Sequence, residues 1–105
     1  MSVDFKGLGD VTVTTAGTRV PLTATQILTP GCVIAAKATN SGNIFVGHDN
    51  VAATTAGAVI RPGETMEITG PQIGGTEEEF DLARIYIDAG SNGDKVTVGY
   101  FARRP

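Results

Sequence analysis

The chain has 105 residues, with 11 acidic and 8 basic side chains and a net charge of −3. This length suits one domain that folds without disulfides or metal, and the acidic balance disfavours nucleic acid, which needs a phosphate-neutralising basic patch. The single cysteine, Cys32, excludes an internal disulfide and a Cys-x-x-Cys zinc or redox motif, so we expect it to be a small buried side chain.

The N-terminal stretch MSVDFKGLGD lacks the basic start and apolar segment of a signal peptide, and no apolar run approaches the ~20 residues of a membrane span. We therefore expect a protein made in the cytoplasm, with no export signal and no membrane partner. Val3, Phe5 and Leu8 alternate with polar and glycine residues, which predicts that residues 1–9 are an N-terminal arm or a first edge strand. Residues 10–105 are predicted to form a single domain.

Alternation of apolar and polar residues predicts strands along most of that domain. In chain order the predicted strands are residues 10–15, 18–23, 32–39, 43–47, 65–69, 82–89 and 95–102. The second is expected at a sheet edge, because Pro21 cannot donate a ladder hydrogen bond. The turn sequences Asn-Ser-Gly and Gly-Ser-Asn-Gly-Asp predict two β-hairpins, one from the third and fourth strands and one from the last two.

Between these strands the sequence predicts turns and loops. Residues 51–58 are expected to be a loop, residues 61–64 a Pro-Gly turn, and Glu77–Glu79 a solvated loop or one helical turn. No segment shows the apolar stripe of an amphipathic helix. The predicted fold is all-β, a small antiparallel β-sandwich or barrel of about 6–8 short strands.

The sequence GNIFVGHDN (42–50) contains the only histidine, next to an aspartate. Neighbouring residues of a strand point to opposite faces, so His48 and Asp49 are poorly placed to cooperate, and two ligands are too few for a zinc site. We interpret the segment as a turn closed by Asp49 or Asn50. Because phosphate-binding loops, nucleophile elbows and dinucleotide fingerprints are also missing, we predict no enzymatic activity, no cofactor and no metal.

Three segments in the order GNIFVG (42–47), IRPGETMEI (60–68) and LARIYIDAGSNGDKVTVGYF (82–101) resemble a pattern in small β-sandwich proteins encoded among the structural genes of tailed bacteriophages and prophages. That pattern joins a G-N-[IV]-[YF]-[VI]-G strand, an L-x-P-G-E turn and a terminal I-Y-[VI]-D … G-D-x-V-x-[VI]-x-[YF] hairpin. The similarity covers about residues 10–102. The chain departs from it at Ile60-Arg61 and at the acidic residues 77–79.

The resemblance implies a virion component, most simply a capsid decoration or cement protein that binds the outside of the shell as a dimer or trimer, with the major capsid protein as its partner. Under this interpretation the contact residues are Val3, Phe5 and Leu8 in the N-terminal segment and the terminal pair Arg103 and Arg104. One alternative is another virion role, in a tail, a fibre or the head–tail joint. The other is a glycan-binding module for host attachment, with Tyr86, Tyr100 and Phe101 as its candidate aromatic residues.

Overall fold

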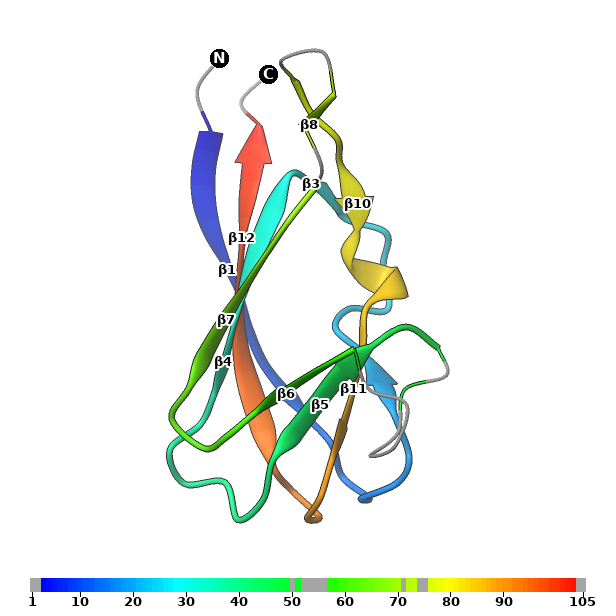
Figure 1. The fold of residues 1–105 in the computed structure, drawn as a ribbon, viewed down its shortest axis with the longest axis vertical. Coiled ribbons are helices and arrows are strands. Elements are labelled where there is room, and N and C mark those ends of the chain that lie inside the picture. The colour runs from blue at the N-terminus through cyan, green and yellow to red at the C-terminus, as the bar shows by residue number, and fades with distance from the viewer. Residues whose placement is uncertain (1–2, 50, 52–56, 71, 74–75, 104–105) are drawn as a thin grey trace.

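The structure is a computed structural model. It describes residues 3–49, 51, 57–70, 72–73 and 76–103. Its main body is a sandwich of two four-stranded antiparallel sheets (Figure 1). The first sheet has the order β1-β12-β4-β7, which are Val3–Thr12, Lys95–Arg103, Gly31–Ala36 and Thr65–Thr69. The second has the order β2-β11-β5-β6, which are Val20–Pro21, Tyr86–Ala89, Ile44–Gly47 and Ala58–Ile60.

Shorter elements lie beside the two sheets. β3 (Leu28–Thr29) pairs with β10 (Phe80–Asp81), and β8 (Gln72–Ile73) pairs with β9 (Thr76–Glu77). A single 3-10 turn, η1 (Leu82–Arg84), leads from β10 toward β11. The all-β prediction is confirmed, and because both large sheets are open the fold is the sandwich of the two predicted alternatives.

The connections between strands have a defined winding. When the eight strands of the two large sheets are counted in chain order, the first sheet reads 1-8-3-6 and the second 2-7-4-5. Every connection except the one between β5 and β6 therefore crosses from one sheet to the other. This winding is that of a double-sheet jelly roll.

Both predicted hairpins are wrong, because β4 and β5 lie in different sheets and so do β11 and β12. The two turns cross the sandwich side by side at one end and bind each other. The side-chain amide of Asn40 forms two hydrogen bonds of 2.9 Å with the backbone of Lys95, one in each direction. The Asp94 carboxylate accepts from the backbone N–H groups of Ser41 and Gly42, each at 2.9 Å. These bonds replace the ladder that a hairpin would have formed.

Several strand limits also differ from the prediction. The first strand begins at Val3 rather than at residue 10 and contains a bulge between Gly7 and Gly9, where Gly9 has a φ of 97°. Residues 82–84, predicted as strand, form η1 because the Asp81 carboxylate caps it by accepting from Ala83 N–H at 2.9 Å. Within the segment Glu77–Glu79, the first residue ends β9 and the other two are exposed.

The positions of β2, β6 and β7 agree with the predicted edge strand, loop and strand. β2 is an edge strand, β7 coincides with the predicted residues 65–69, and β6 begins at Ala58, the last residue of the predicted 51–58 loop. Residues 52–56 of that loop lie outside the described residues.

The core lies between the sheets and consists of small and medium aliphatic side chains. Its buried members are Val13, Leu22, Cys32, Ile34, Ala36, Ile44, Val46, Ile60, Leu82, Ile85, Ile87, Ala89, Val96 and Val98. The predicted inward faces are confirmed for residues 82–89 and for β12: Ile85 and Ile87 are buried while Tyr86 is half-exposed on the outer face, and Val96 and Val98 are buried. The core is thin because no aromatic side chain is fully buried among the described residues.

Cys32 is buried between the sheets, as predicted, and burial raises the pKa of its thiol to about 11. Since the thiolate is the reactive form, Cys32 is expected not to react with an aromatic disulfide reagent at neutral or mildly alkaline pH while the protein is folded. In denaturant it should react fully. Absorbance at the reagent's thiolate band measures both states, and rapid stoichiometric reaction of the folded protein would contradict the placement of Cys32.

Candidate functional site

The long ribbon of β1 and β12 carries an aromatic pair, the exposed Phe5 and the half-buried Phe101, on the outer face of the first sheet. Phe5 lies opposite Phe101 in the register, and their ring centroids are 5.0 Å apart with an interplanar angle of 53°. Glycine makes room for both rings: a Cβ on Gly99 would collide with Cζ of Phe5, and one on Gly31 would lie 3.4 Å from Cδ2 of Phe101. The Phe5 side chain remains 59% exposed. We call Phe5 and Phe101, with the glycines beneath them, the aromatic face.

The aromatic face includes only one of the five residues predicted to contact a partner. Leu8 is half-buried and packs against the core at the β1 bulge. Val3 and Arg103 face each other in the backbone register, although their side chains lie outside the described ones. Arg104 is outside the described residues altogether. Of the two predicted residues whose side chains are described, Phe5 is exposed and Leu8 is half-buried.

The N-terminal segment is not a separate arm from residue 3 onward. Residues 3–9 form the first part of β1, which is antiparallel to β12 from Val3 to Thr12 (Figure 1). This is the edge-strand alternative of the sequence analysis. As an edge strand, β1 can pair with a strand of a neighbouring chain while it stays bound to β12, and the exposed Phe5 side chain adds a second kind of contact.

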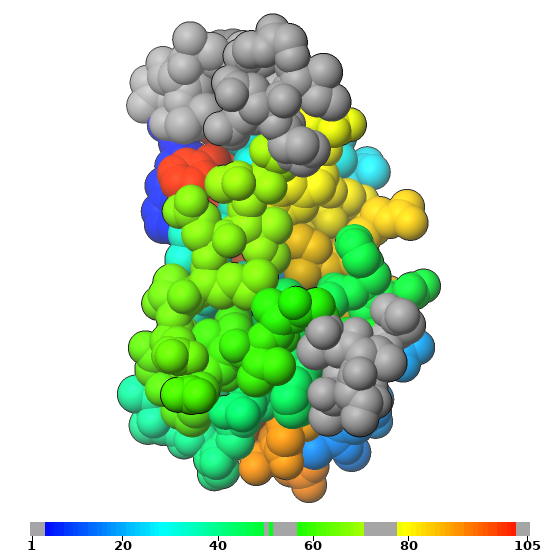
Figure 2. Space-filling model, viewed as in Figure 1, coloured from blue at the N-terminus to red at the C-terminus, as the bar shows by residue number. Residues whose placement is uncertain are grey.

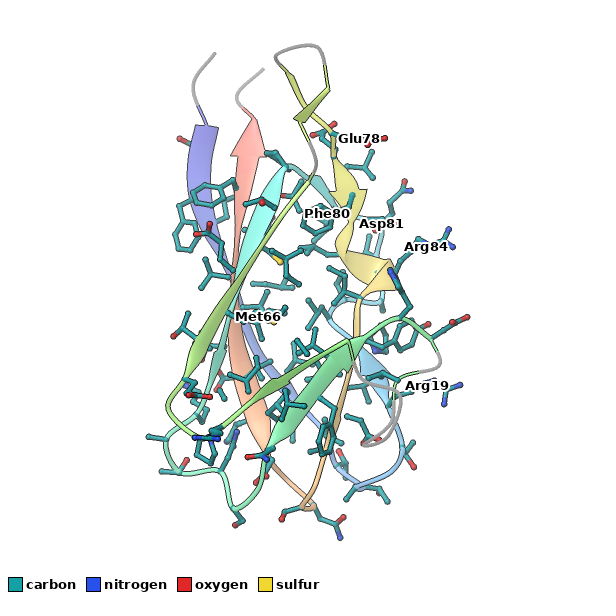
Figure 3. All side chains as sticks on the ribbon, viewed as in Figure 1. Arg19, Met66, Glu78, Phe80, Asp81 and Arg84 are labelled. Atoms are coloured by element: carbon teal, nitrogen blue, oxygen red, sulfur yellow. The ribbon has the colours of Figure 1, made fainter. Side chains whose placement is uncertain are left out.

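A second feature is an apolar groove of about 610 Å³ between β7 of the first sheet and the segment formed by β10 and η1. It lies beside β7, and Figure 2 shows that face with β7 in yellow-green next to β10 and η1 in yellow. Met66 comes from β7 and Phe80 from β10, on opposite sides of the groove (Figure 3). The other apolar residues of the groove are Val46, Ala58, Ile68 and Ile85.

Asp81 lies at the rim of this groove and fixes the local backbone. Its carboxylate accepts from Ala83 N–H at 2.9 Å and from Ile27 N–H at 3.2 Å. These hydrogen bonds, the one to Ala83 most strongly, lower the pKa of the Asp81 carboxyl, with a smaller contribution from the charge of Arg84. Asp81 therefore holds η1, and with it Arg84, against the β3 segment.

Two polar cavities adjoin Tyr86 on the outer face of the second sheet. One, of about 420 Å³, is lined by His48, Asp49, Ala83, Arg84 and Tyr86. The other, of about 440 Å³, is lined by Gly17, Thr18, Arg19 and Tyr86. Figure 3 shows Arg19 and Arg84 projecting from the same side of the molecule.

His48 belongs to the first of these cavities and lies in a turn, as predicted. The turn is closed by the main chain, because Val51 N–H donates to the His48 carbonyl at 3.0 Å. Asn50, one of the two residues expected to close it, lies outside the described residues. The ring was not expected to have a structural contact, but Nδ1 lies 3.0 Å from the Arg84 carbonyl, which can only accept, so Nδ1 carries the proton.

Within the described ranges, no three His, Cys, Asp or Glu side chains gather as potential metal ligands. No described helix has the length and apolarity to cross a membrane. No sequence pattern indicated Arg19 or Arg84 as a site residue. They are 65 positions apart and join only because the 14–19 loop and η1 flank the same tyrosine, which no local pattern indicates.

Comparisons with known proteins give no assignment: no protein-family model, no curated protein and no solved structure matches this chain.

Proposed function

We propose that this protein is a capsid decoration protein of a tailed bacteriophage, which binds the outside of the shell formed by the major capsid protein. The observation that carries the proposal is the aromatic face: Phe5 is 59% exposed on the outer side of a sheet, where a partner can cover it. The resemblance to virion β-sandwich proteins supplies the identity of the partner. The jelly-roll winding is compatible with it, because viral capsid domains use this architecture.

The energetics of the aromatic face suit such attachment. Burying an exposed phenylalanine is worth roughly 1.5–3 kcal/mol, and aromatic anchors are frequent hot spots of protein interfaces. A decoration protein that sits as a dimer or trimer at a symmetry position repeats this contact in each copy. Modest affinity at one Phe5 thereby becomes firm attachment through avidity.

The start of β1 and the end of β12 lie near the aromatic face. Val3 and Arg103 are register partners, so the start of β1 and the end of β12 lie side by side, close to the Phe5–Phe101 pair. Val3, Arg103 and Arg104 stay proposed contact residues from the sequence. The alternative virion roles, in a tail, a fibre or a head–tail joint, use the same surface on a different partner.

Substitution of Phe5 tests the proposal. Phe5→Ala is expected to weaken binding to shells assembled without the protein by about tenfold or more, because it removes a central apolar anchor. Co-sedimentation of the purified protein with such shells, over a concentration series, measures the affinity. Substitution is a cleaner test than deletion of residues 1–9, which would also remove most of β1.

Val59→Ala is the matched control, since Val59 is 52% exposed on β6 in the other sheet. Its binding is expected to stay within about twofold of the original, because scattered exposed apolar residues contribute little. Melting curves should show both variants folded. Equal binding by the Phe5 variant would remove the aromatic face from the contact, and failure of the unmodified protein to bind any shell would overturn the decoration role.

A further inference from the structure

The region around Tyr86 has features that attachment to a shell does not require. In the register, Tyr86 lies between Pro21 of β2 and Gly47 of β5, so neither neighbouring strand places a long side chain over its ring. The two polar cavities of about 420 and 440 Å³ share this tyrosine. Each is within the usual size of a small-ligand site.

The cavity at Arg19 is suited to a carboxylate. None of its described lining residues is acidic, and no described carboxylate forms an ion pair with Arg19. The loop before Arg19 is held over the second sheet by two hydrogen bonds, from Gly17 N–H to Asp88 Oδ1 at 2.9 Å and from Ala16 N–H to Asn92 Oδ1 at 2.7 Å. A guanidinium on an anchored loop offers a two-pronged donor for a planar anion.

The cavity at Arg84 is suited to hydroxyl groups. It combines donors on Arg84 with acceptors on the exposed Asp49 carboxylate. Because His48 uses its Nδ1–H for the Arg84 carbonyl, its Nε2 remains to accept a hydrogen bond. Mixed donors and acceptors beside an amphipathic aromatic ring match a sugar, which has hydroxyls at its edges and C–H groups on its faces.

We propose that Tyr86, Arg19 and Arg84 form a binding site for an acidic oligosaccharide. One sugar unit lies at Arg84, His48 and Asp49, and a carboxylate-bearing unit binds Arg19, with the chain of sugars passing over Tyr86. The three candidate aromatic residues of a glycan site are thereby separated: Tyr100 packs partly against the core and Phe101 against Phe5, whereas Tyr86 has a polar cavity on each side. The site is independent of the aromatic face.

The test uses trigalacturonate as the acidic probe, maltotriose as the neutral one and triglutamate as a carboxylate-bearing peptide. Amide chemical shifts of the ¹⁵N-labelled protein are followed during each titration. Trigalacturonate is expected to bind with a Kd of about 1 mM or tighter and to shift the amides of Arg19, Arg84 and Tyr86. Maltotriose and triglutamate are expected to bind at least about tenfold more weakly, because each lacks either the carboxylate or the sugar rings.

Arg19→Gln is expected to weaken trigalacturonate binding about tenfold, which corresponds to about 1.4 kcal/mol. Arg61→Gln is the matched control, since Arg61 is an exposed arginine outside both cavities, and it should change the affinity less than twofold. Tyr86→Ala should abolish binding, and the arginine variants keep the test valid if the tyrosine variant unfolds. Absent binding by the unmodified protein, equal binding of triglutamate, or equal losses in the Arg19 and Arg61 variants would each overturn the proposal.

Discussion

Replacing Ile34 with alanine is expected to lower the free energy of unfolding by about 2–5 kcal/mol. Ile34 is fully buried at the centre of β4, between Val98 of β12 and Met66 of β7. The substitution removes three carbon atoms from a site enclosed by both sheets, and the surrounding strands can collapse only partly into the space. Urea denaturation followed by circular dichroism measures the change.

Two further substitutions on β4 make this prediction specific. Ile34→Val removes one methylene and should cost about 0.5–1.5 kcal/mol, in proportion to the smaller cavity. Val33→Ala changes the adjacent residue, which faces the outer side and is half-buried, so it should cost less than Ile34→Ala. A larger loss from the Val33 variant would mean that the inward and outward faces of β4 have been exchanged.

The faces of strands could be predicted from sequence because a strand's side chains alternate with a period of two. Val96 and Val98 of β12 are fully buried, and Met66 and Ile68 of β7 point inward with exposed neighbours, as the alternation indicates. The bulge in β1 is the exception. Alternation alone puts Leu8 on the face opposite Phe5, but Leu8 and Val11, three residues apart, both pack against the core, and the register shift between Gly7 and Gly9 makes this possible.

The pairing of strands was not predictable from local signals. A turn sequence between two alternating strands fits a hairpin within one sheet and a corner between two sheets equally well. The choice depends on distant residues: Asn40 binds the backbone of Lys95, and Val13 N–H donates to the carbonyl of Asp94 at 2.9 Å. These contacts join segments separated by more than 50 residues, which no window of sequence displays.

For the candidate sites too, single residues were predictable from sequence but their neighbours in space were not. The exposure of Phe5 followed from an apolar residue in a polar, glycine-rich segment, but its seat over Gly99 follows from the pairing of the two ends of the chain. Likewise, Tyr86 was a candidate from sequence alone. Its two flanking arginines come from the loop before β2 and from η1, and only the sandwich winding brings both to one tyrosine.

Replacing Asp94, which joins the two turns between the sheets, is expected to give the second large loss of stability. Asp94 is 4% exposed, and its two carboxylate oxygens each accept one backbone N–H, from Ser41 and from Gly42, at 2.9 Å. Asp94→Ala removes both acceptors. A hydrogen bond to a charged group contributes about 1.5–3 kcal/mol, and these two are part-buried, so the free energy of unfolding is expected to fall by about 2–5 kcal/mol. Chemical denaturation of the purified variant measures this loss.

Asp94→Asn retains one acceptor oxygen and should lose less than the alanine variant, because only one of the two N–H groups is left without a partner. Asp49→Ala is the control, since Asp49 is exposed in the turn after β5, and its stability should change by no more than about 0.5 kcal/mol. If the Asp94 and Asp49 variants were equally stable, the two turns would not depend on this carboxylate. Because the same turns carry the chain from one sheet to the other, the ranking of the three variants measures how much the Asp94 carboxylate at this corner contributes to the stability of the jelly roll.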